Sequence, residues 1–334
     1  MNKPVSMKDV AAEVGVSAMT VSAILRGKGS YAEETIRKVH EVANRLGYRR
    51  NSQARAMRRG RSDCLALIHG RSDHQSKLEE GIVAGIDAAL ADTEFHLATG
   101  MCRESTISEM SELPKILRES AADGAFVNYH YSPPPAVEEL LMNHRIPAVW
   151  LNNKRDVDSV YFDDLGAARL ATEHLLDLGH RRLAYVEWSA THKLISRHYS
   201  RGDRQQGYVR AMEAAGLAPQ VICDDGKTPF ATALKAELEA GVTAFITMTD
   251  CQQLVGHAAL MGYRAPDDFS ILALAHRPLG SYVPLETVQL SWSSLGREAG
   301  KLMLRKLAAD GAAVESVAVA GALHEGGSCA RLQP

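Results

Sequence analysis

From residue 64 onward, short β-rich runs alternate with segments whose apolar residues recur at helical spacing. This alternation is typical of parallel sheets with helices on both faces. Eight strand-like runs favour two doubly wound lobes over one sheet, with ligands at the carboxyl ends of the strands. The predicted strands are 64–68, 95–99, 124–128, 147–152, 183–188, 221–223, 243–247 and 270–275, and the predicted helices include 78–91, 166–178, 205–215, 231–240, 254–261 and 295–309. We therefore predict an α/β body with a site between two lobes.

The first sixty residues have a different pattern, in which glycines separate three short helices. Ser6, followed three residues later by Asp9, is a helix-start signature, and Gly15 ends the apolar run that follows. Ser17 is placed to cap a second helix, and residues 32–46 form a third. Two short helices joined by a glycine-containing turn and supported by a third match the helix-turn-helix plan, whose second helix fits the major groove of DNA.

Charge is distributed unevenly along the chain. Residues 1–62 contain 13 Lys and Arg against five Asp and Glu, a net charge of +8, and because the whole chain carries −2, the remainder carries −10. A basic head on an acidic body is expected when only the head meets a polyanion. A solvated basic tail without a partner is the alternative, and the folding pattern of the head disfavours it.

The composition excludes several classes of protein. With 46% hydrophobic and 23% charged residues among 334, the chain fits a globular protein of two or three units. No run approaches the roughly 18 apolar residues that span a bilayer, and the first residues lack the apolar core of a signal peptide. The scattered cysteines (Cys64, Cys102, Cys223, Cys251 and Cys329) include no CxxC pair, which predicts free thiols. We predict a cytoplasmic protein with no membrane partner, metal site or cofactor.

Residues 49–61 contain six arginines around a short helical pattern that Asn51 or Ser52 can cap and Gly60 can end. A helix this short is marginal in water, and its arginines repel one another unless anions lie nearby. We expect a segment that is disordered alone and folds on DNA phosphates. The alternative is a linker whose arginines only add non-specific affinity.

Residues 7–60, "MKDVAAEVGVSAMTVSAILRGKGSYAEETIRKVHEVANRLGYRRNSQARAMRRG", closely resemble the head of the lac repressor (LacI/GalR) family. The body resembles the same family, and with it the periplasmic sugar-binding fold. "DDLGA" at 163–167, "RQQGY" at 204–208 and "GYRAPDDFSIL" at 262–272 carry that second resemblance. The implied fold is a small all-α helix-turn-helix head plus an α/β body with two doubly wound parallel-sheet lobes of the periplasmic-binding-protein-like type.

The resemblance also implies domain boundaries. A helix-turn-helix DNA-binding domain would span 1–48, a hinge helix or linker 49–62, and an effector-binding and dimerisation domain 63–334. Lobe one would comprise about 63–162 and 292–319, and lobe two about 163–291 and 320–334.

In this family the first residues of the second helix face base edges, and paired hinge helices enter the minor groove. Ala23 stands where the family usually carries Arg, so recognition of the bases shifts toward van der Waals contact. Met57 takes the place of a Leu that inserts between base pairs of the minor groove in the family. Ala32 replaces the usual Ser cap of the third helix, so Ser30 or solvent must satisfy its N–H groups. The DNA-binding residues implied by the resemblance are Ser17, Ala18, Met19, Thr20, Ser22, Ala23, Tyr48, Asn51, Ala54, Arg55, Met57 and Arg58.

The function that the resemblance implies is sequence-specific regulation of transcription, by repression as the family's default although activators exist. Two chains would pair through their bodies, because a twofold protein matches a pseudo-palindromic operator. A small-molecule effector (a sugar, a sugar acid or another small metabolite) bound between the lobes would change the spacing of the two hinges. Operator affinity and effector affinity would then be coupled reciprocally.

Positions that contact effectors in the family are occupied here by Asn128, Asn152, Arg204, Asp250, His276 and Trp292. Arg204 would grip the ligand with forked donors, and Trp292 would stack on a ring. Sugar-responsive members of the family carry an aspartate at the position of Ala275. In this chain that aspartate is missing, and the next residue is His276. With His276 and Arg204 as cations, we expect an anionic or less hydroxylated ligand. A site that binds nothing, or binds a protein co-regulator, is the alternative.

Two other classes fit the sequence less well. An enzyme on a doubly wound fold would need a GxGxxG after its first strand, a P-loop or a GxSxG elbow, and the chain has none of these. The 13 histidines form no HExxH motif. A periplasmic binding protein would share the body fold, but it would carry a signal peptide and no DNA-binding head. We therefore predict no enzyme and no catalytic residue.

Overall fold

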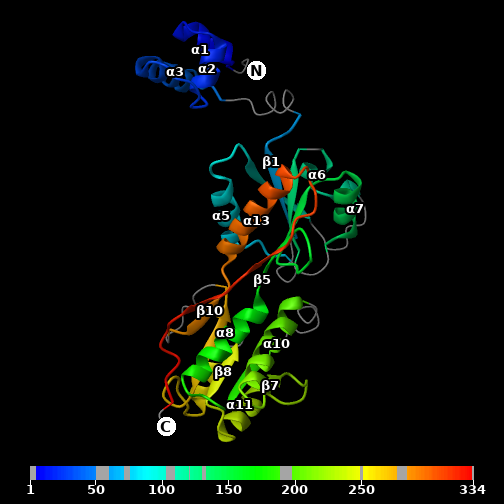
Figure 1. The fold of residues 1–334 in the computed structure, drawn as a ribbon, viewed down its shortest axis with the longest axis vertical. Coiled ribbons are helices and arrows are strands. Elements are labelled where there is room, and N and C mark those ends of the chain that lie inside the picture. The colour runs from blue at the N-terminus through cyan, green and yellow to red at the C-terminus, as the bar shows by residue number, and fades with distance from the viewer. Residues whose placement is uncertain are drawn as a thin grey trace. The chain divides into compact units, whose positions relative to one another are not determined.

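Two compact units, Met1–Ser62 and Asp63–Pro334, make up the chain and are called the head and the body (Figure 1). The computed structural model describes residues 5–49, 60–70, 76–102, 110–119, 121–129, 133–188, 198–248, 251–276 and 284–332. None of the helices in these ranges combines the length and the apolar character needed to cross a bilayer.

The described head consists of helices α1 (Met7–Val14), α2 (Ala18–Ile24) and α3 (Glu33–Leu46). Ser6 accepts a hydrogen bond from the Asp9 backbone N–H, and the Asp9 carboxylate accepts one from the Ser6 N–H at 2.7 Å. The predicted capping signature is therefore confirmed. Gly15 ends α1 with a φ of 84°, a left-handed conformation that favours glycine.

The three helices of the head pack around one apolar cluster. Ser17 caps α2 by accepting a hydrogen bond from the Thr20 N–H at 3.0 Å, as predicted. No side chain, Ser30 included, caps α3, whose first flanking residue is Ala32. The buried members of the cluster are Val10, Ala11, Val14, Val21, Ile24, Val39, Val42 and Ala43. The helix-turn-helix plan predicted for the head is confirmed.

Two six-stranded sheets form the framework of the described body. The strands of the first sheet are β1 (Cys64–Gly70), β2 (His96–Cys102), β3 (Gly124–Asn128), β4 (Ala148–Leu151), β5 (Ser159–Phe162) and β11 (Val317–Val319). Those of the second sheet are β6 (Leu183–Glu187), β7 (Gln220–Cys223), β8 (Ala244–Thr247), β9 (Ser270–Ala275), β10 (Glu286–Gln289) and β12 (Ala322–His324). The strand orders are β11-β5-β4-β3-β1-β2 and β12-β10-β9-β8-β6-β7. All described neighbours are parallel except β10 and β12, so the parallel α/β class is confirmed with one unpredicted antiparallel edge.

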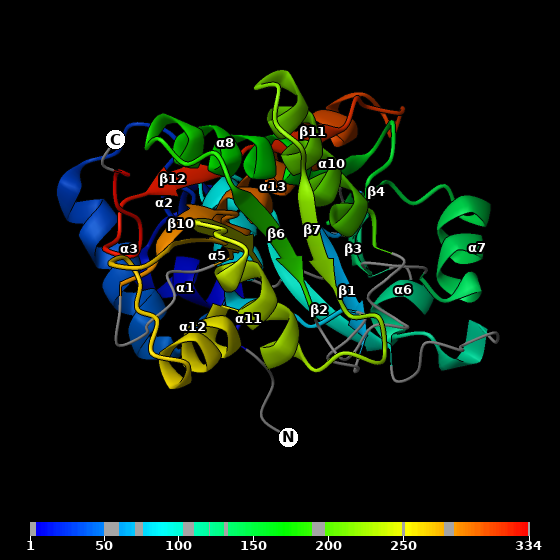
Figure 2. The ribbon, with the colours of Figure 1, turned by 90° about the horizontal axis from the view of Figure 1, so that it is seen from below.

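Each sheet is covered by helices on both faces and forms one lobe of the body (Figures 1 and 2). The helices are α5 (Glu80–Leu90), the 3-10 turn η1 (Met110–Glu112), α6 (Lys115–Arg118), α7 (Pro135–Asn143), α8 (Asp164–Asp177), α10 (Tyr199–Ala214), α11 (Phe230–Glu239), α12 (Cys251–Leu260) and α13 (Trp292–Ala308). Along β1, Leu65 and Leu67 pack with α5 and α13, whereas Ala66 and Ile68 pack with α6 and α7. The second sheet likewise has α8 and α10 on one face and α11 and α12 on the other.

The described chain passes between the lobes at three places. β5 leads into α8, β10 into α13, and β11 into β12. Because β5, β10 and β11 each run into a crossing, the carboxyl ends of both parallel sheets meet where the lobes join. Parallel α/β sheets bind their ligands at this edge.

Several elements differ from the sequence prediction. The strands β5, β10, β11 and β12 were not predicted. β11 and β12 have three residues each, too few for a periodic pattern to separate from a loop, but β5 and β10 are as long as the predicted β4, β7 and β8. The helices α6 and α7 were also missed. Helix α10 begins at Tyr199 and not at 205. The His198 side chain caps its first turn, and Gly202 in that turn interrupts the apolar spacing that would predict a helix.

Candidate functional site

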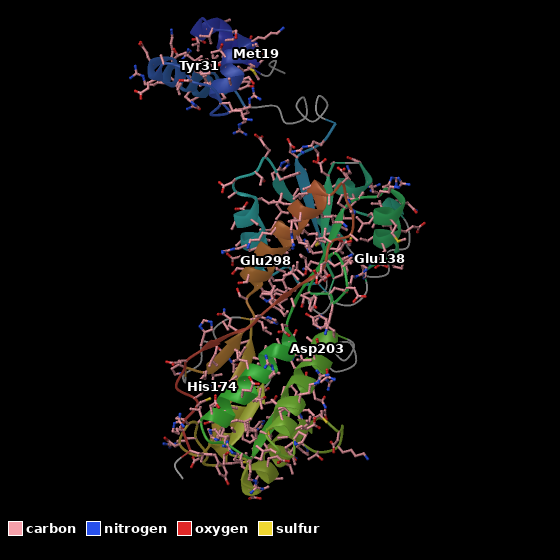
Figure 3. The ribbon with its side chains drawn as sticks, viewed as in Figure 1. Met19, Tyr31, Glu138, His174, Asp203 and Glu298 are labelled. Atoms are coloured by element: carbon pink, nitrogen blue, oxygen red, sulfur yellow. The ribbon has the colours of Figure 1, made fainter. Side chains whose placement is uncertain are left out.

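The second helix of the head presents the side chains that the sequence assigned to DNA. Its apolar residues Val21 and Ile24 face the core of the head, and Ala18 packs against that core as well. Met19 is 79% exposed, and Figure 3 shows it on the surface of the head. Ser17 is exposed as well, and its hydroxyl also caps the helix. Ala18, Thr20, Ser22 and Ala23 are partly exposed.

The remaining residues predicted to bind DNA follow α3. Tyr48 is partly buried and packs on the apolar cluster of the head, which orients its ring. Asn51, Ala54, Arg55, Met57 and Arg58 lie outside the described residues, and with them the predicted hinge helix.

In the body, side chains from both lobes meet at the carboxyl ends of the strands. We call this group the interlobe site and define it as Asn152, Phe162, Asp164, His198, Tyr199, Arg204, His276 and Trp292. Four of the residues predicted to contact an effector, Asn152, Arg204, His276 and Trp292, belong to it. Phe162, Asp164, His198 and Tyr199 were not predicted as site residues, although Asp164 lies in the "DDLGA" motif.

A buried cation, the guanidinium of Arg204 on α10, lies in the interlobe site. Its Nη1 donates to Asp164 Oδ1 at 2.9 Å, and its Nη2 lies 3.9 Å from Glu187 Oε1 at the end of β6. Burial raises the pKa of Asp164 to about 6, although Arg204 acts in the opposite direction. Asp164 is therefore mostly ionised at neutral pH and serves as the counter-ion of Arg204.

Hydrogen bonds join the two lobes around Asn152, which follows β4. The Tyr199 hydroxyl donates to Asn152 Oδ1 at 2.9 Å, and His198 Nε2 donates to the Asn152 carbonyl at 3.0 Å. Nearby, Lys154 Nζ of the first lobe lies 2.6 Å from Asp203 Oδ2 of the second. Figure 3 shows Asp203 near the end of α10 that lies closest to the first lobe. These contacts form a polar bridge between the lobes.

Three rings form the apolar part of the interlobe site. The ring centroid of Phe162 lies 5.0 Å from that of His276 and 4.9 Å from that of Trp292. His276 and Trp292 are 4.5 Å apart. Phe162 is the last residue of β5, His276 follows β9 and Trp292 opens α13, so both lobes contribute. Such a ring cluster offers flat apolar surface to a ligand.

The two histidines of the interlobe site are neutral at physiological pH. Burial lowers the pKa of His276 to about 4, and the charge of Arg204 acts in the same direction. Burial likewise lowers the pKa of His198 to about 4. The expectation that His276 supplies a cation for an anionic ligand is therefore wrong, because a buried imidazole next to a guanidinium does not hold a proton.

One other predicted effector residue, Asn128, is not part of this group. Asn128 is fully buried at the end of β3, and its amide donates to the carbonyls of Ser76 at 3.4 Å and Lys77 at 3.2 Å. Asp250 lies outside the described residues. Among the residues that are described, no cluster of His, Cys, Asp and Glu has an arrangement suited to a metal ion.

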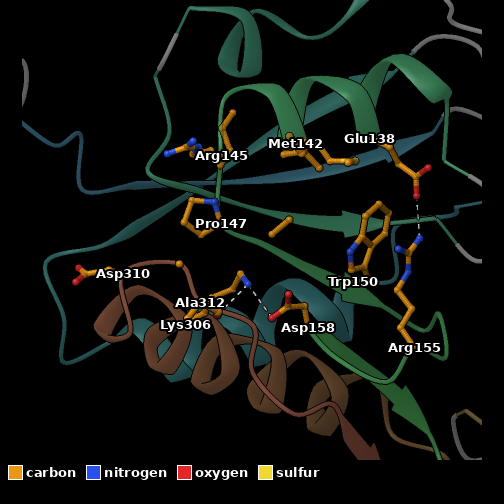
Figure 4. A pocket seen from close by; sticks show the side chains of 14 residues that line it. Glu138, Met142, Arg145, Pro147, Trp150, Arg155, Asp158, Lys306, Asp310 and Ala312 are labelled. Carbon is orange, nitrogen blue, oxygen red and sulfur yellow. Dashed lines mark hydrogen bonds and ion pairs between the residues drawn. The ribbon is translucent and has the colours of Figure 1, made fainter.

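A pocket of about 770 Å³ lies elsewhere, on the first lobe between α7 and the segment after α13 (Figure 4). The Arg155 guanidinium lies 3.6 Å from the centroid of the Trp150 ring, and it pairs with Glu138 at 2.9 Å. Lys306 at the floor is buried and pairs with Asp158 at 2.8 Å. None of the residues predicted to contact an effector lines this pocket.

Two family models match the chain. The model of the bacterial regulatory proteins of the lacI family matches residues 6–51, and that of the periplasmic binding protein-like domain matches residues 172–329. The maltose regulon regulatory protein MalI of Escherichia coli (strain K12) is 30% identical over 221 residues, which cover 64% of this chain and only 61% of MalI. The HTH-type transcriptional regulator CelR of Thermobifida fusca is 27% identical over 326 residues, covering 90% of this chain and 92% of CelR.

Solved structures share the fold along nearly the whole chain. The lac repressor dimer bound to operator and the anti-inducer ONPF has a TM-score of 0.67 at 19% identity, covering 98% of this chain and 100% of that chain. The CelR–cellobiose complex has a TM-score of 0.63 at 22% identity, covering 97% and 99%. The chain belongs to the LacI family of bacterial regulatory proteins, which are DNA-binding regulators of transcription.

Proposed function

We propose that this chain is a homodimeric repressor whose affinity for a pseudo-palindromic operator is set by a small molecule bound at the interlobe site. In this proposal residues 1–48 read DNA, 49–62 form the hinge and 63–334 bind the effector and the second chain. The observation that carries the proposal is the capped helix α2, which turns Val21 and Ile24 inward and leaves Met19 exposed. The net charge of +8 on residues 1–62 also favours binding of a polyanion such as DNA by this part of the chain.

Support for the effector comes from the location of the interlobe site. The site lies at the carboxyl ends of both parallel sheets, and its hydrogen bonds join one lobe to the other. A ligand that contacts both lobes favours one arrangement of them and thereby changes the distance between the two hinges of a dimer. CelR is known in complex with cellobiose, and the lac repressor as a dimer on its operator. By analogy we propose a small hydroxylated effector and a dimer for this chain.

Selection of DNA fragments from the source genome tests the proposal. Full-length wild type and Met19→Glu are each mixed with the fragments, and the bound DNA is sequenced. We expect the wild type to enrich a palindromic sequence and Met19→Glu to lose about 1–3 kcal/mol of operator affinity per half-site, because a carboxylate replaces an apolar contact in the groove.

Met142→Glu on α7 is the matched control, because Met142 is 78% exposed and lies in the body. It adds the same charge at the same exposure and should bind the operator like the wild type. Enrichment of the same palindrome by Met19→Glu would contradict the assignment of α2. The absence of any enriched sequence with the wild type would contradict the regulator proposal itself.

A further inference from the structure

The pocket on the first lobe has at its floor a buried cation with an unused hydrogen-bond donor. Lys306, near the end of α13, is 5% exposed. Its ammonium group donates to the Ala312 carbonyl at 3.1 Å and lies 2.8 Å from Asp158 Oδ1 (Figure 4). An ammonium carries three N–H donors, so these two contacts, within the described part of the chain, leave one donor over. A ligand oxygen at this point would satisfy a group that is costly to bury unpaired.

One wall of the same pocket is apolar and is held in place. Met142 of α7, Pro147 and Trp150 of β4 line this wall (Figure 4). The Arg155 guanidinium lies 3.6 Å from the centroid of the Trp150 ring, and Glu138 holds Arg155 at 2.9 Å. The ring therefore cannot swing aside without breaking an ion pair. A fixed apolar wall next to one polar anchor is typical of sites that bind a ring with a single polar substituent.

The charges that line the pocket cancel. Two of its three cations, Arg155 and Lys306, each have a carboxylate partner. The third cation, Arg145, is exposed, and so is the third acidic residue, Asp310. A charged ligand therefore meets as many like charges as opposite ones, and a carboxylate at Lys306 would also meet the partner of that lysine where solvent screens poorly. The lining favours a neutral ligand.

We propose that this pocket is a second small-molecule site, separate from the interlobe site. Its ligand is a neutral compound that places an apolar ring against Pro147 and Trp150 and a carbonyl or hydroxyl oxygen at Lys306. The volume of about 770 Å³ lies within the roughly 300–1,000 Å³ of small-molecule sites. No residue of the interlobe site lines the pocket, so the two sites can be occupied independently.

The first experiment uses benzamide as the probe, with benzoate and benzylamine as charged compounds of similar size. Binding to the full-length chain is titrated by saturation-transfer NMR for the wild type, Ala312→Phe and Ala313→Phe. Both alanines are exposed, but only Ala312 lines the pocket. We expect benzamide to bind the wild type and Ala313→Phe equally, and Ala312→Phe at least about tenfold more weakly, because the added ring fills the pocket. Benzoate and benzylamine should bind the wild type more weakly than benzamide.

Three outcomes of this titration would overturn the proposal. They are no binding of benzamide to the wild type, equal binding of benzamide to the wild type and Ala312→Phe, and tighter binding of either charged compound. Trp292→Ala, a change in the interlobe site, should leave the affinity for benzamide as it is in the wild type. Loss of benzamide binding in Trp292→Ala but not in Ala312→Phe would place the probe in the interlobe site. No DNA is present, so the result is independent of whether the chain binds an operator.

The second experiment tests the donor of Lys306. Lys306→Met is combined with Asp158→Asn, so that no carboxylate loses its partner and the oxygen that accepts from the Val314 N–H at 3.0 Å is kept. Toluene, which has no acceptor, is the reference probe. We expect the affinity for benzamide to fall about threefold to tenfold and the affinity for toluene to stay the same.

Unchanged benzamide affinity in this double variant would overturn the role of Lys306. An equal loss of both probes would also overturn it, because the ion pair would then only hold the pocket open. The thermal unfolding midpoint shows whether the double variant is folded. If it is not, the comparison of Ala312→Phe with Ala313→Phe decides alone, since both exposed positions tolerate a larger side chain.

Discussion

The second helix of the head and the interlobe site of the body use their side chains in opposite ways. Met19 on α2 is 79% exposed, whereas Arg204 in the interlobe site is 5% exposed and bound to Asp164. On α2, the exposed Met19 would contact DNA, whereas the buried Val21 and Ile24 hold the fold. In the interlobe site the same atoms do both. Substitution of Met19 should therefore change binding alone, whereas substitutions in the interlobe site should change binding and stability together.

The largest expected effect is on the buried ion pair. Arg204→Met leaves Asp164 buried without its counter-ion, which should lower the free energy of unfolding by about 3–5 kcal/mol. Urea denaturation of the full-length chain measures the loss. Arg204→Met combined with Asp164→Leu should recover most of it, because an apolar pair can replace a buried ion pair at little net cost. If the double variant is as unstable as the single one, the loss comes from packing and not from an uncompensated charge.

The second effect is on the free energy of unfolding as a function of pH, to which Asp164 and His276 contribute with opposite signs. The folded-state pKa of Asp164 is about 6, above its ordinary 3.8. The folded chain therefore holds a proton that the unfolded chain has lost, and this contribution to stability falls as the pH rises from about 4 to about 6. The folded-state pKa of His276 is about 4, below its ordinary 6.5, so its contribution falls as the pH drops from about 6.5 to about 4.

Stability measured against pH for the wild type, Asp164→Asn and His276→Phe separates these two contributions. Each wild-type-minus-variant difference should change by at most about 3 kcal/mol across its window. Arg204, Asp203 and Tyr199 face Asp164, and Arg204 and His198 face His276, so these groups must be unchanged in the variants. If the two wild-type-minus-variant differences in stability changed with pH in the same direction, or did not change with pH, the charge states assigned to the interlobe site would be contradicted.

A smaller effect compares two helix caps in the head. Ser6→Ala and Ser17→Ala each remove a side chain that accepts a backbone N–H at the start of a helix. Each should lower the stability of the head by about 1 kcal/mol, as measured by hydrogen exchange. Only Ser17 lies on the proposed DNA-binding surface, so only Ser17→Ala should weaken operator binding beyond the effect of lost stability. Equal weakening by Ser6→Ala would mean that Ser17 acts through the fold alone.

The smallest energetic effect concerns the ion pair between the lobes. Lys154→Met should change stability by less than about 1 kcal/mol, because Lys154 is largely exposed to solvent. Lys301→Met is the matched control, since Lys301 pairs with Glu298 inside α13 at 2.7 Å and joins no two lobes. We expect both variants to keep their stability, and Lys154→Met alone to change operator affinity. Identical operator affinities would show that this ion pair does not affect the head.

The sequence predicted the head better than the interlobe site for a physical reason. The caps Ser6 and Ser17 each act on the residue three positions further along the chain, so a local motif defines them. The pairing of Arg204 with Asp164 joins residues 40 positions apart and arises only when α8 and α10 pack together. The ionisation of His276 depends on burial that no local pattern records. Among the strands, β11 and β12 are too short for a local pattern to identify, and only their neighbours in the sheets define them.

A covalent bridge between the lobes tests whether their arrangement controls operator binding. Lys154→Cys and Asp203→Cys are introduced together with Cys223→Ser, because Cys223 is an exposed native thiol. A short thiol-specific crosslinker then fixes the lobes, and operator affinity is compared before and after crosslinking, with cysteines at 298 and 301 on α13 as the control. We expect operator affinity to change when the lobes are crosslinked and to stay the same in the control. Equal operator affinity before and after crosslinking would show that the arrangement of the lobes does not control the head.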